Sequence, residues 1–333
     1  MSKRVATFFD MKLHARGRSR AEGNTADFPA RPKSLLEIKD LVESLFQSGD
    51  IFLSKGHSDK ADKYYIAHSD TVDGHWVLLI NRCDPSAPDS VYSNPESKER
   101  TVNEKLPGQG SEYSAHLILN LQPVKGSDYY FCIIEAAYGS GLGSSAITSY
   151  FAHIIRHCKK QKPHLFRIPN IDGSRDKKGG QNVVHLVHDV ELHGHISETF
   201  KSDLQSGALG GIELISYKSV GDKWDDAGFV KEKHRIIKLD LEKDLIGDAV
   251  KTVADVLRKA KAKGDGIAQM RVSFKDGSGS ANSALLSVDT GQLATDGGRY
   301  LKRYSISSAN NVSSASIEQV NHAIVKEVLK SLE

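Results

Sequence analysis

Short apolar runs, several with the two-residue period of β-strands, recur through the first half of the chain. They are residues 5–15, 50–56, 63–70, 75–83, 114–124 and 128–138. Two other stretches repeat apolar residues every three or four positions, as amphipathic helices do. One begins at a capping-box pair, Ser34 and Glu37, and the other follows the glycines at 139–143 and runs to about His157. This half therefore predicts antiparallel strands with two helices.

The second half of the chain shows the same mixture. Its predicted strands are residues 182–196, 210–219, 233–241, 268–276 and 283–291. A basic helix is expected over 243–263, and a final helix from a capping box at Ser316 and Gln319. The polar, glycine-bearing segment 166–181 reads as a hinge. We thus predict an α+β fold of two domains, 1–165 and 182–333, each a mostly antiparallel sheet with flanking helices.

Two polar segments interrupt the strands of the first domain. The first strand is expected to run into a basic loop that starts near Arg16. Residues 84–111 hold three prolines in their first dozen positions and almost no aliphatic residues. A segment of that length and composition predicts a long loop or arm.

Composition bears on the cellular compartment of the protein and on membrane insertion. Of the 333 residues, 39% are hydrophobic, and no apolar run approaches the roughly 20 residues needed to cross a bilayer. The N-terminus has no apolar stretch typical of a signal peptide. Cys83, Cys132 and Cys158 are widely spaced and form no CxxC pair. We expect a cytoplasmic protein with reduced thiols and no membrane insertion of its own.

The net charge of +3 does not by itself indicate nucleic acid, but the positive charges gather in two blocks. The candidate DNA-binding residues are Lys12, Arg16, Arg18, Arg20, Arg156, Lys159, Lys160, Lys162, Arg167, Arg175, Lys177 and Lys178. Such blocks can neutralise phosphates and gain affinity through counterion release. The alternative is a pair of solvated surface loops. No base-reading motif is visible, so any DNA binding should tolerate many sequences.

The glycines at 139, 141 and 143 lie between a strand and a helix, where dinucleotide-binding loops occur. That fingerprint needs G-x-G-x-x-G and an acidic residue about twenty positions further on. Here the third glycine comes one residue early, and the later segment CKKQKP has no acid. We expect a sharp turn, with Ser144 or Ser145 capping the helix and at most one phosphate contact.

A row of histidines and acids between His185 and His195 is the other chemical candidate. In a strand, five of these side chains would share one face: His185, Asp189, Glu191, His193 and His195. Two of these histidines with one carboxylate could chelate zinc. Their spacing matches no established metal motif, and no nuclease or serine-hydrolase motif is present. We therefore assign no catalytic residue, metal ligand or cofactor, and expect a binding protein rather than an enzyme.

The order of segments resembles the RexA-type phage-exclusion proteins of lambdoid prophages. The shared features are the basic opening strand, the glycine and Ser/Thr turn into a helix, the strand VVHLVHDVELHG, a basic helix and a C-terminal helix. The resemblance implies a cytoplasmic, non-catalytic protein that dimerises, encloses duplex DNA and acts with an effector partner. It points to Lys12, Arg16, Arg18 and Arg20, and to Lys159, Lys160, Lys162 and Arg167.

Three hypotheses follow. The first is a sequence-tolerant, dimeric double-stranded-DNA-binding protein of an anti-phage or prophage-exclusion system. The second is a metal-dependent nuclease effector that uses the acids and histidines of 185–195. The third is a protein-interaction subunit that does not bind nucleic acid.

Overall fold

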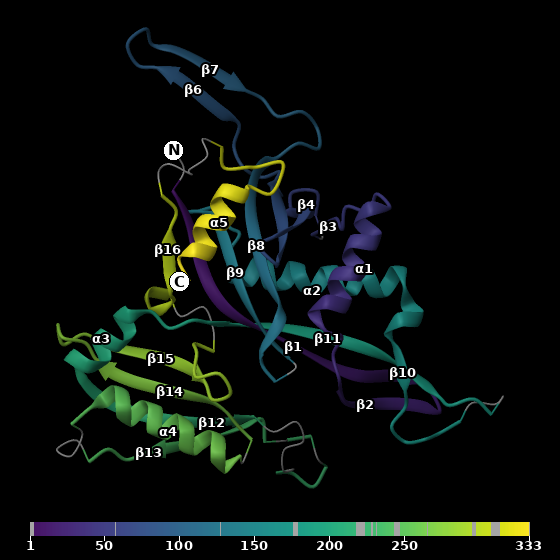
Figure 1. Cartoon of the computed structure of the whole chain (residues 1–333), viewed down its shortest axis with the longest axis vertical. Coiled ribbons are helices and arrows are strands. Elements are labelled where there is room, and N and C mark those ends of the chain that lie inside the picture. Colours follow the sequence, from purple (N-terminus) through teal and green to yellow (C-terminus); the bar gives the residue numbers. More distant parts are fainter. Residues whose placement is uncertain are drawn as a thin grey trace. The chain divides into compact units, whose positions relative to one another are not determined.

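The computed structural model describes residues 3–56, 58–126, 128–175, 179–217, 224–227, 229–230, 232–242, 247–264, 266–294, 298–307 and 314–332. Lys177 and Lys178 lie outside this part of the chain. The fold is α+β, as the sequence predicts, with antiparallel sheets and flanking helices (Figure 1). Two compact units are present. Unit 1 comprises Met1–Ala6, Met11–Glu191 and Tyr304–Glu333, and unit 2 comprises Thr7–Asp10 and Leu192–Arg303.

A large sheet has the strand order β10-β11-β1-β9-β8-β5-β4-β3, with β2 and β16 also paired to β1. The strands are β1 Arg4–Ala21, β2 Asn24–Ala30, β3 Ser54–Lys55, β4 Lys63–Val72, β5 His75–Asp84, β8 Ser111–Lys125, β9 Tyr129–Ala137, β10 Arg167–Pro169, β11 Val183–Gly194 and β16 Arg303–Ser305. The helices of unit 1 are α1 Leu35–Gln47, α2 Ser144–Gln161 and α5 His322–Lys330, with a 3₁₀ turn at Pro163–Phe166.

Unit 2 has a smaller sheet in the order β13-β12-β14-β15. Its strands are β12 Ala208–Tyr217, β13 His234–Leu239, β14 Ile267–Lys275 and β15 Ala281–Ser287, and its helices are α3 Glu198–Ser206, α4 Ala249–Lys263 and a 3₁₀ turn at Gly298–Tyr300. Phe200, Phe274 and Tyr300 pack ring against ring and join the helix, the sheet and the turn.

The expected basic loop after the first strand is strand instead. β1 continues to Ala21 because β2 pairs with it, with Gly17 opposite Phe28. The Phe28 ring covers that glycine so closely that a Cβ there would lie 2.5 Å from the ring. Because residue 17 has no side chain, the Phe28 ring can pack directly against the backbone of the opposite strand. Long-range pairing overrides the turn-like composition of this stretch.

The segment 166–181 is not a hinge between domains. Its β10 pairs with β11, with Arg167 opposite His185, and the Asn170 N–H donates to the Asn182 carbonyl at 2.8 Å. It therefore forms a hairpin within unit 1. The division falls between Glu191 and Leu192, and residues 304–333 return to unit 1. The predicted domain boundaries differ for this reason.

The arm predicted at 84–111 carries a two-stranded sheet, β6 Ser90–Asn94 and β7 Glu99–Asn103. All ten strand residues are exposed, and the hairpin extends away from the rest of unit 1 at the top of Figure 1. At its base the Lys105 ammonium donates to the carbonyls of Pro85 and Ala87.

Helix starts were predicted with mixed success. The capping box of Ser34 and Glu37 is present at α1. The cap of α2 is Gly143, without a side-chain hydrogen bond, so the predicted serine cap is wrong. The last helix begins after Asn321, whose side chain accepts the N–H groups of the first turn. Ser316 does not cap it because its hydroxyl instead donates to Glu112 on β8.

A buried ionic group joins three strands of unit 1 to α5. Arg4 Nε lies 2.5 Å from Glu135 Oε1, and His116 Nδ1 lies 2.6 Å from Glu135 Oε2. All three side chains are fully buried. The Asn321 N–H donates to His116 Nε2 at 3.0 Å, which makes that nitrogen an acceptor. His116 thus donates from Nδ1 to Glu135 and accepts at Nε2.

Candidate nucleic-acid interface

The geometry of β1 determines which of its basic side chains lie on the same face of the strand. Successive side chains of a strand point to opposite faces, so residues 12, 16, 18 and 20 share one face. Burial alternates accordingly: Ala15 and Gly17 are buried, whereas Arg16, Arg18 and Arg20 are exposed. The continuation of β1 to Ala21 therefore fixes the spacing of three arginines that a loop would leave variable.

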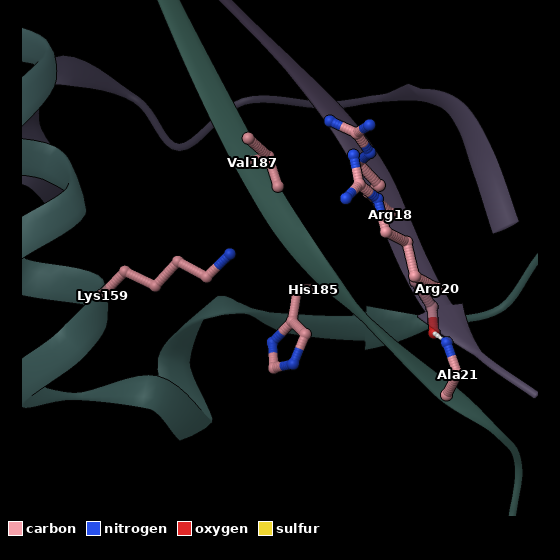
Figure 2. Close-up of a pocket in the computed structure, with 7 residues that line it drawn as sticks. Arg18, Arg20, Ala21, Lys159, His185 and Val187 are labelled. Carbon is pink, nitrogen blue, oxygen red and sulfur yellow. Dashed lines mark hydrogen bonds between the residues drawn. The ribbon is translucent and has the colours of Figure 1, made fainter. Parts of the chain in front are cut away.

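The structure brings the two basic blocks together in one pocket of about 410 Å³ in unit 1. The pocket is lined by Arg18, Ser19, Arg20, Ala21, Lys159, His185 and Val187. Figure 2 shows Lys159 reaching from α2 toward β11, which carries His185 and Val187, with Arg18 and Arg20 on the neighbouring β1. None of the side chains that line it is acidic. Residues some 140 positions apart in the sequence thus form one positive surface.

Two basic side chains that line the pocket have lowered pKa values, chiefly because they are partly buried. Burial lowers the pKa of His185, and the charges of Lys159 and Arg167 lower it further. Burial also lowers the pKa of Lys159. Both effects disfavour an additional proton in the pocket. An anion would offset them, so the pocket is electrostatically suited to a phosphate group.

Arg16 and Lys12 differ from the arginines of the pocket. Arg16 Nε lies 2.6 Å from Asp27 Oδ1 on β2, so its charge is neutralised within the hairpin. Lys12 is half-buried, and its ammonium stands 5.2 Å from the centre of the Tyr129 ring. These two predicted residues are therefore weaker candidates for phosphate contact.

The second basic block is dispersed around the end of α2 and the β10–β11 hairpin. Arg156, Lys160 and Lys162 are exposed, and the last two also sit where a helix C-terminus favours cations. Arg167 is exposed and lies opposite His185, a residue of the pocket, in the register of β10 with β11. Arg175 is exposed and donates to the Gly179 carbonyl.

The histidine and acid row does not form one face. His185, Asp189 and Glu191 are exposed, but Leu192, His193 and Gly194 are buried in succession, which ends the alternation. Glu191 lies 3.3 Å from His14 of β1, and His195 lies 2.9 Å from Asp10 in unit 2. Across the described residues, no group of three or more His, Cys, Asp or Glu side chains could hold a metal ion.

His188 points away from the pocket. Its Nε2 accepts the Lys33 N–H at 2.9 Å, and its ring meets the edge of Phe166. Burial, helped by nearby cations, lowers the pKa of His188 to about 4. This histidine is a neutral core residue near α1.

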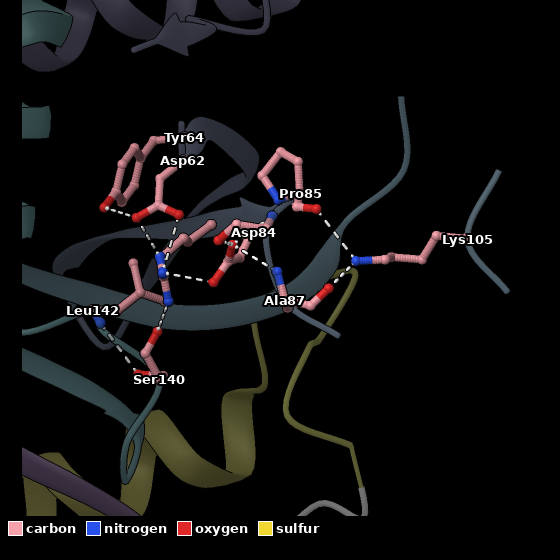
Figure 3. Close-up of polar contacts among 10 residues, drawn as sticks. Asp62, Tyr64, Asp84, Pro85, Ala87, Lys105, Ser140 and Leu142 are labelled. Carbon is pink, nitrogen blue, oxygen red and sulfur yellow. Dashed lines mark hydrogen bonds and ion pairs between the residues drawn. The ribbon is translucent and has the colours of Figure 1, made fainter. Parts of the chain in front are cut away.

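The glycine loop is held by an arginine rather than open to a nucleotide. Gly139 and Gly141 have positive φ, and Arg82 Nη1 donates to the Ser140 carbonyl at 2.8 Å (Figure 3). A Cβ on Gly141 would lie 2.6 Å from that nitrogen. Arg82 is itself fixed by ion pairs to Asp62 and Asp84. The glycines therefore allow a close approach between the turn and β5.

The sequence reasoning missed one feature of the basic surfaces. The sequence offers His185 as a candidate metal ligand, whereas the pairing of β11 with β1 places it in the basic pocket. Unit 2 carries a separate basic helix, α4, where Lys251, Arg258 and Lys259 are exposed. Arg258 is ion-paired with Asp255 at 3.1 Å. The basic character of this helix is predicted from the sequence.

Comparisons with protein-family models, curated proteins and solved structures give no match. Nowhere in the described residues is a helix both long enough and apolar enough to span a bilayer.

Proposed function

We propose that this protein binds double-stranded DNA with little sequence preference, through the basic surface of unit 1. The observation that carries the proposal is the shared pocket of Arg18, Arg20, Lys159 and His185, which has no acidic lining residue. Two separated blocks of charge could have been unrelated solvated surfaces. Their convergence favours a polyanionic ligand.

The kind of contact supports tolerance of sequence. Guanidinium and ammonium groups on a strand face and a helix end are suited to phosphate oxygens, and phosphate contacts carry no direct sequence information. Duplex DNA offers many phosphates at regular spacing, whereas a small anion would engage the pocket alone. The exposed Arg156, Lys160 and Arg167 extend the surface beyond one phosphate.

The biological setting that we propose comes from the resemblance to RexA-type proteins. In that setting the protein is a cytoplasmic homodimer that encloses duplex DNA and acts with an effector in anti-phage defence or prophage exclusion. Two copies would double the number of phosphate contacts, which a single basic surface limits. Light scattering at micromolar concentration should report a dimer, stabilised further by DNA. A protein that is monomeric both alone and on a short duplex would contradict the proposed dimer around DNA.

The direct test uses two 30-base-pair duplexes of unrelated sequence, labelled with a fluorophore, with EDTA present and absent. We expect fluorescence anisotropy to report similar affinity for both duplexes, unaffected by EDTA, with the DNA intact afterwards. No binding at 50 mM salt would overturn the proposal in favour of a protein-interaction subunit. Cleavage that requires magnesium would favour the nuclease hypothesis instead.

A further inference from the structure

The turn that follows β10 presents an apolar side chain inside the basic region. Ile171 is 76% exposed, directly after Asn170, which is 2% exposed. The exposed Arg167 lies before this turn and the exposed Arg175 after it. Single exposed apolar residues are common on proteins, so exposure alone decides nothing. The rigidity of the turn and its charged surroundings make Ile171 unusual.

The turn is held in one conformation by its own side chains. Asp172 Oδ1 accepts the Ser174 N–H at 2.8 Å, and the Asn170 side-chain amide donates to Asp172 Oδ2 at 3.1 Å. Gly173 adopts a positive φ of 68°. Asp172 is thus engaged inside the turn, and hydrogen bonds from the Ser174 hydroxyl and N–H lower the pKa of its carboxyl. Ile171 is therefore exposed on a turn whose conformation these hydrogen bonds fix.

The same turn is tied to the β1–β2 hairpin that carries the arginines. The Asn170 amide donates to Asn24 Oδ1 at 2.8 Å, and the Asn24 amide donates to the Val183 carbonyl at 3.0 Å. Both hairpins belong to unit 1. The position of Ile171 is therefore coupled to that of Arg18 and Arg20, and one ligand can meet all three.

We propose that Ile171 inserts between base pairs from the minor groove while Arg18, Arg20 and Arg167 neutralise the flanking phosphates. This inference rests on the proposed DNA binding and adds a mode of engagement to it. Proteins that bind the minor groove use apolar wedges of this kind, supported by arginine, to unstack a base step and bend the duplex. An apolar wedge also needs no particular base, which agrees with sequence tolerance.

The experiment uses a 30-base-pair duplex with a central T·T mismatch, because a mismatched step unstacks at little cost. A 2-aminopurine beside the mismatch reports unstacking, and a donor–acceptor pair at the ends reports bending. The unaltered protein should raise the 2-aminopurine fluorescence and shorten the end-to-end distance, with a bend of roughly 20° to 90°. It should also prefer the mismatched duplex over the matched one.

The Ile171→Ala variant should bind with an affinity reduced by no more than about tenfold, since its phosphate contacts remain. It should give neither signal and show no preference for the mismatch. The matched control is Ile51→Ala, which truncates the same residue type at a 53% exposed position outside the basic hairpins and should behave as the unaltered protein.

Binding without unstacking, or equal signals from Ile171→Ala, would overturn the wedge and leave the proposed DNA binding intact. Equal signals are also the result expected if the turn docks on a protein. Absence of binding to any duplex would remove both the wedge and the proposed function.

Discussion

Removal of two arginines from the pocket should change the salt dependence of DNA binding by a calculable amount. The perturbation is the double substitution Arg18→Ala and Arg20→Ala. Both side chains are exposed on β1 and line the pocket, whereas Arg16 on the same face is ion-paired with Asp27. From the proposed DNA binding we therefore expect two phosphate contacts from this pair and none from Arg16.

The expected magnitude follows from counterion release. The slope of log K against log salt is about −0.9 for each phosphate contact with B-form DNA, so loss of two contacts should flatten it by about 1.8. The affinity ratio between the unaltered protein and the variant should then shrink about 12-fold between 50 and 200 mM salt, which is four raised to the power 1.8. The loss should be equal for unrelated DNA sequences.

The assay is fluorescence anisotropy across a salt series, with two control proteins. Lys251→Ala with Lys259→Ala removes the same charge from α4 in unit 2 and should leave the slope unchanged. Arg16→Ala with Asp27→Ala removes a whole ion pair and should also leave it unchanged. Equal flattening by the α4 variant would show that only net charge matters. A loss confined to one DNA sequence would refute the phosphate assignment.

Three further predictions concern the pocket and the fold. Gly141→Ala should lower the free energy of unfolding by about 1 to 3 kcal/mol because φ is 72° there. Gly143→Ser should raise it by roughly a few tenths of a kcal/mol because a serine side chain can cap α2. Chemical denaturation checks both, and ATP or NAD binding lost on Gly141→Ala without destabilisation would contradict this view. The lowered pKa of His185 leaves its side chain neutral near pH 7. Because a proton would add positive charge to the pocket, DNA should bind more tightly as the pH falls from 7.5 to 5.5. The same pH dependence of affinity in His185→Asn would contradict this role of His185. Burial alone would raise the pKa of Glu135, but hydrogen bonds and charges from His116 and Arg4 hold it below the ordinary value. The ionised Glu135 therefore stabilises the fold above about pH 4.5, and this contribution is lost at lower pH. Glu135→Gln should cost on the order of 3 to 5 kcal/mol at pH 7 by leaving Arg4 buried without its counter-charge, and unchanged urea unfolding would contradict this.

Local pattern was sufficient to predict what depends on near neighbours. The two-residue period predicted most strands and the α+β class, and the capping box placed the start of α1. The charge blocks could also be seen directly, and the structure brings members of both together. Their partners could not be predicted in this way. Asp27 lies opposite Arg18 in the register of β1 with β2 and forms its ion pair diagonally with Arg16, and that register is set by pairing rather than by composition.

The wrong predictions share the same cause. The polar segment 166–181 has the composition of a hinge, but β11 supplies hydrogen-bond partners that turn its start into a strand. His193 and His195 follow the alternation of β11 in the sequence, yet the chain passes into unit 2 at Leu192, and His195 meets Asp10 there. A period of two predicts a shared face only as long as one strand stays in one environment.

The extension of β1 through the basic block also suggests why such a surface would read phosphates and not bases. Alternate residues of a strand are about 6.6 to 6.8 Å apart, so Arg18 and Arg20 project at a fixed interval from the same face. Phosphates recur along each DNA strand at a spacing that does not depend on the base sequence, so arginines held at a fixed interval can contact them whatever the bases are. A flexible loop with the same composition could adapt to many anions but would lose conformational entropy on binding each. The pairing of β1 with β2 and β11 incurs that ordering cost during folding, before any DNA is met.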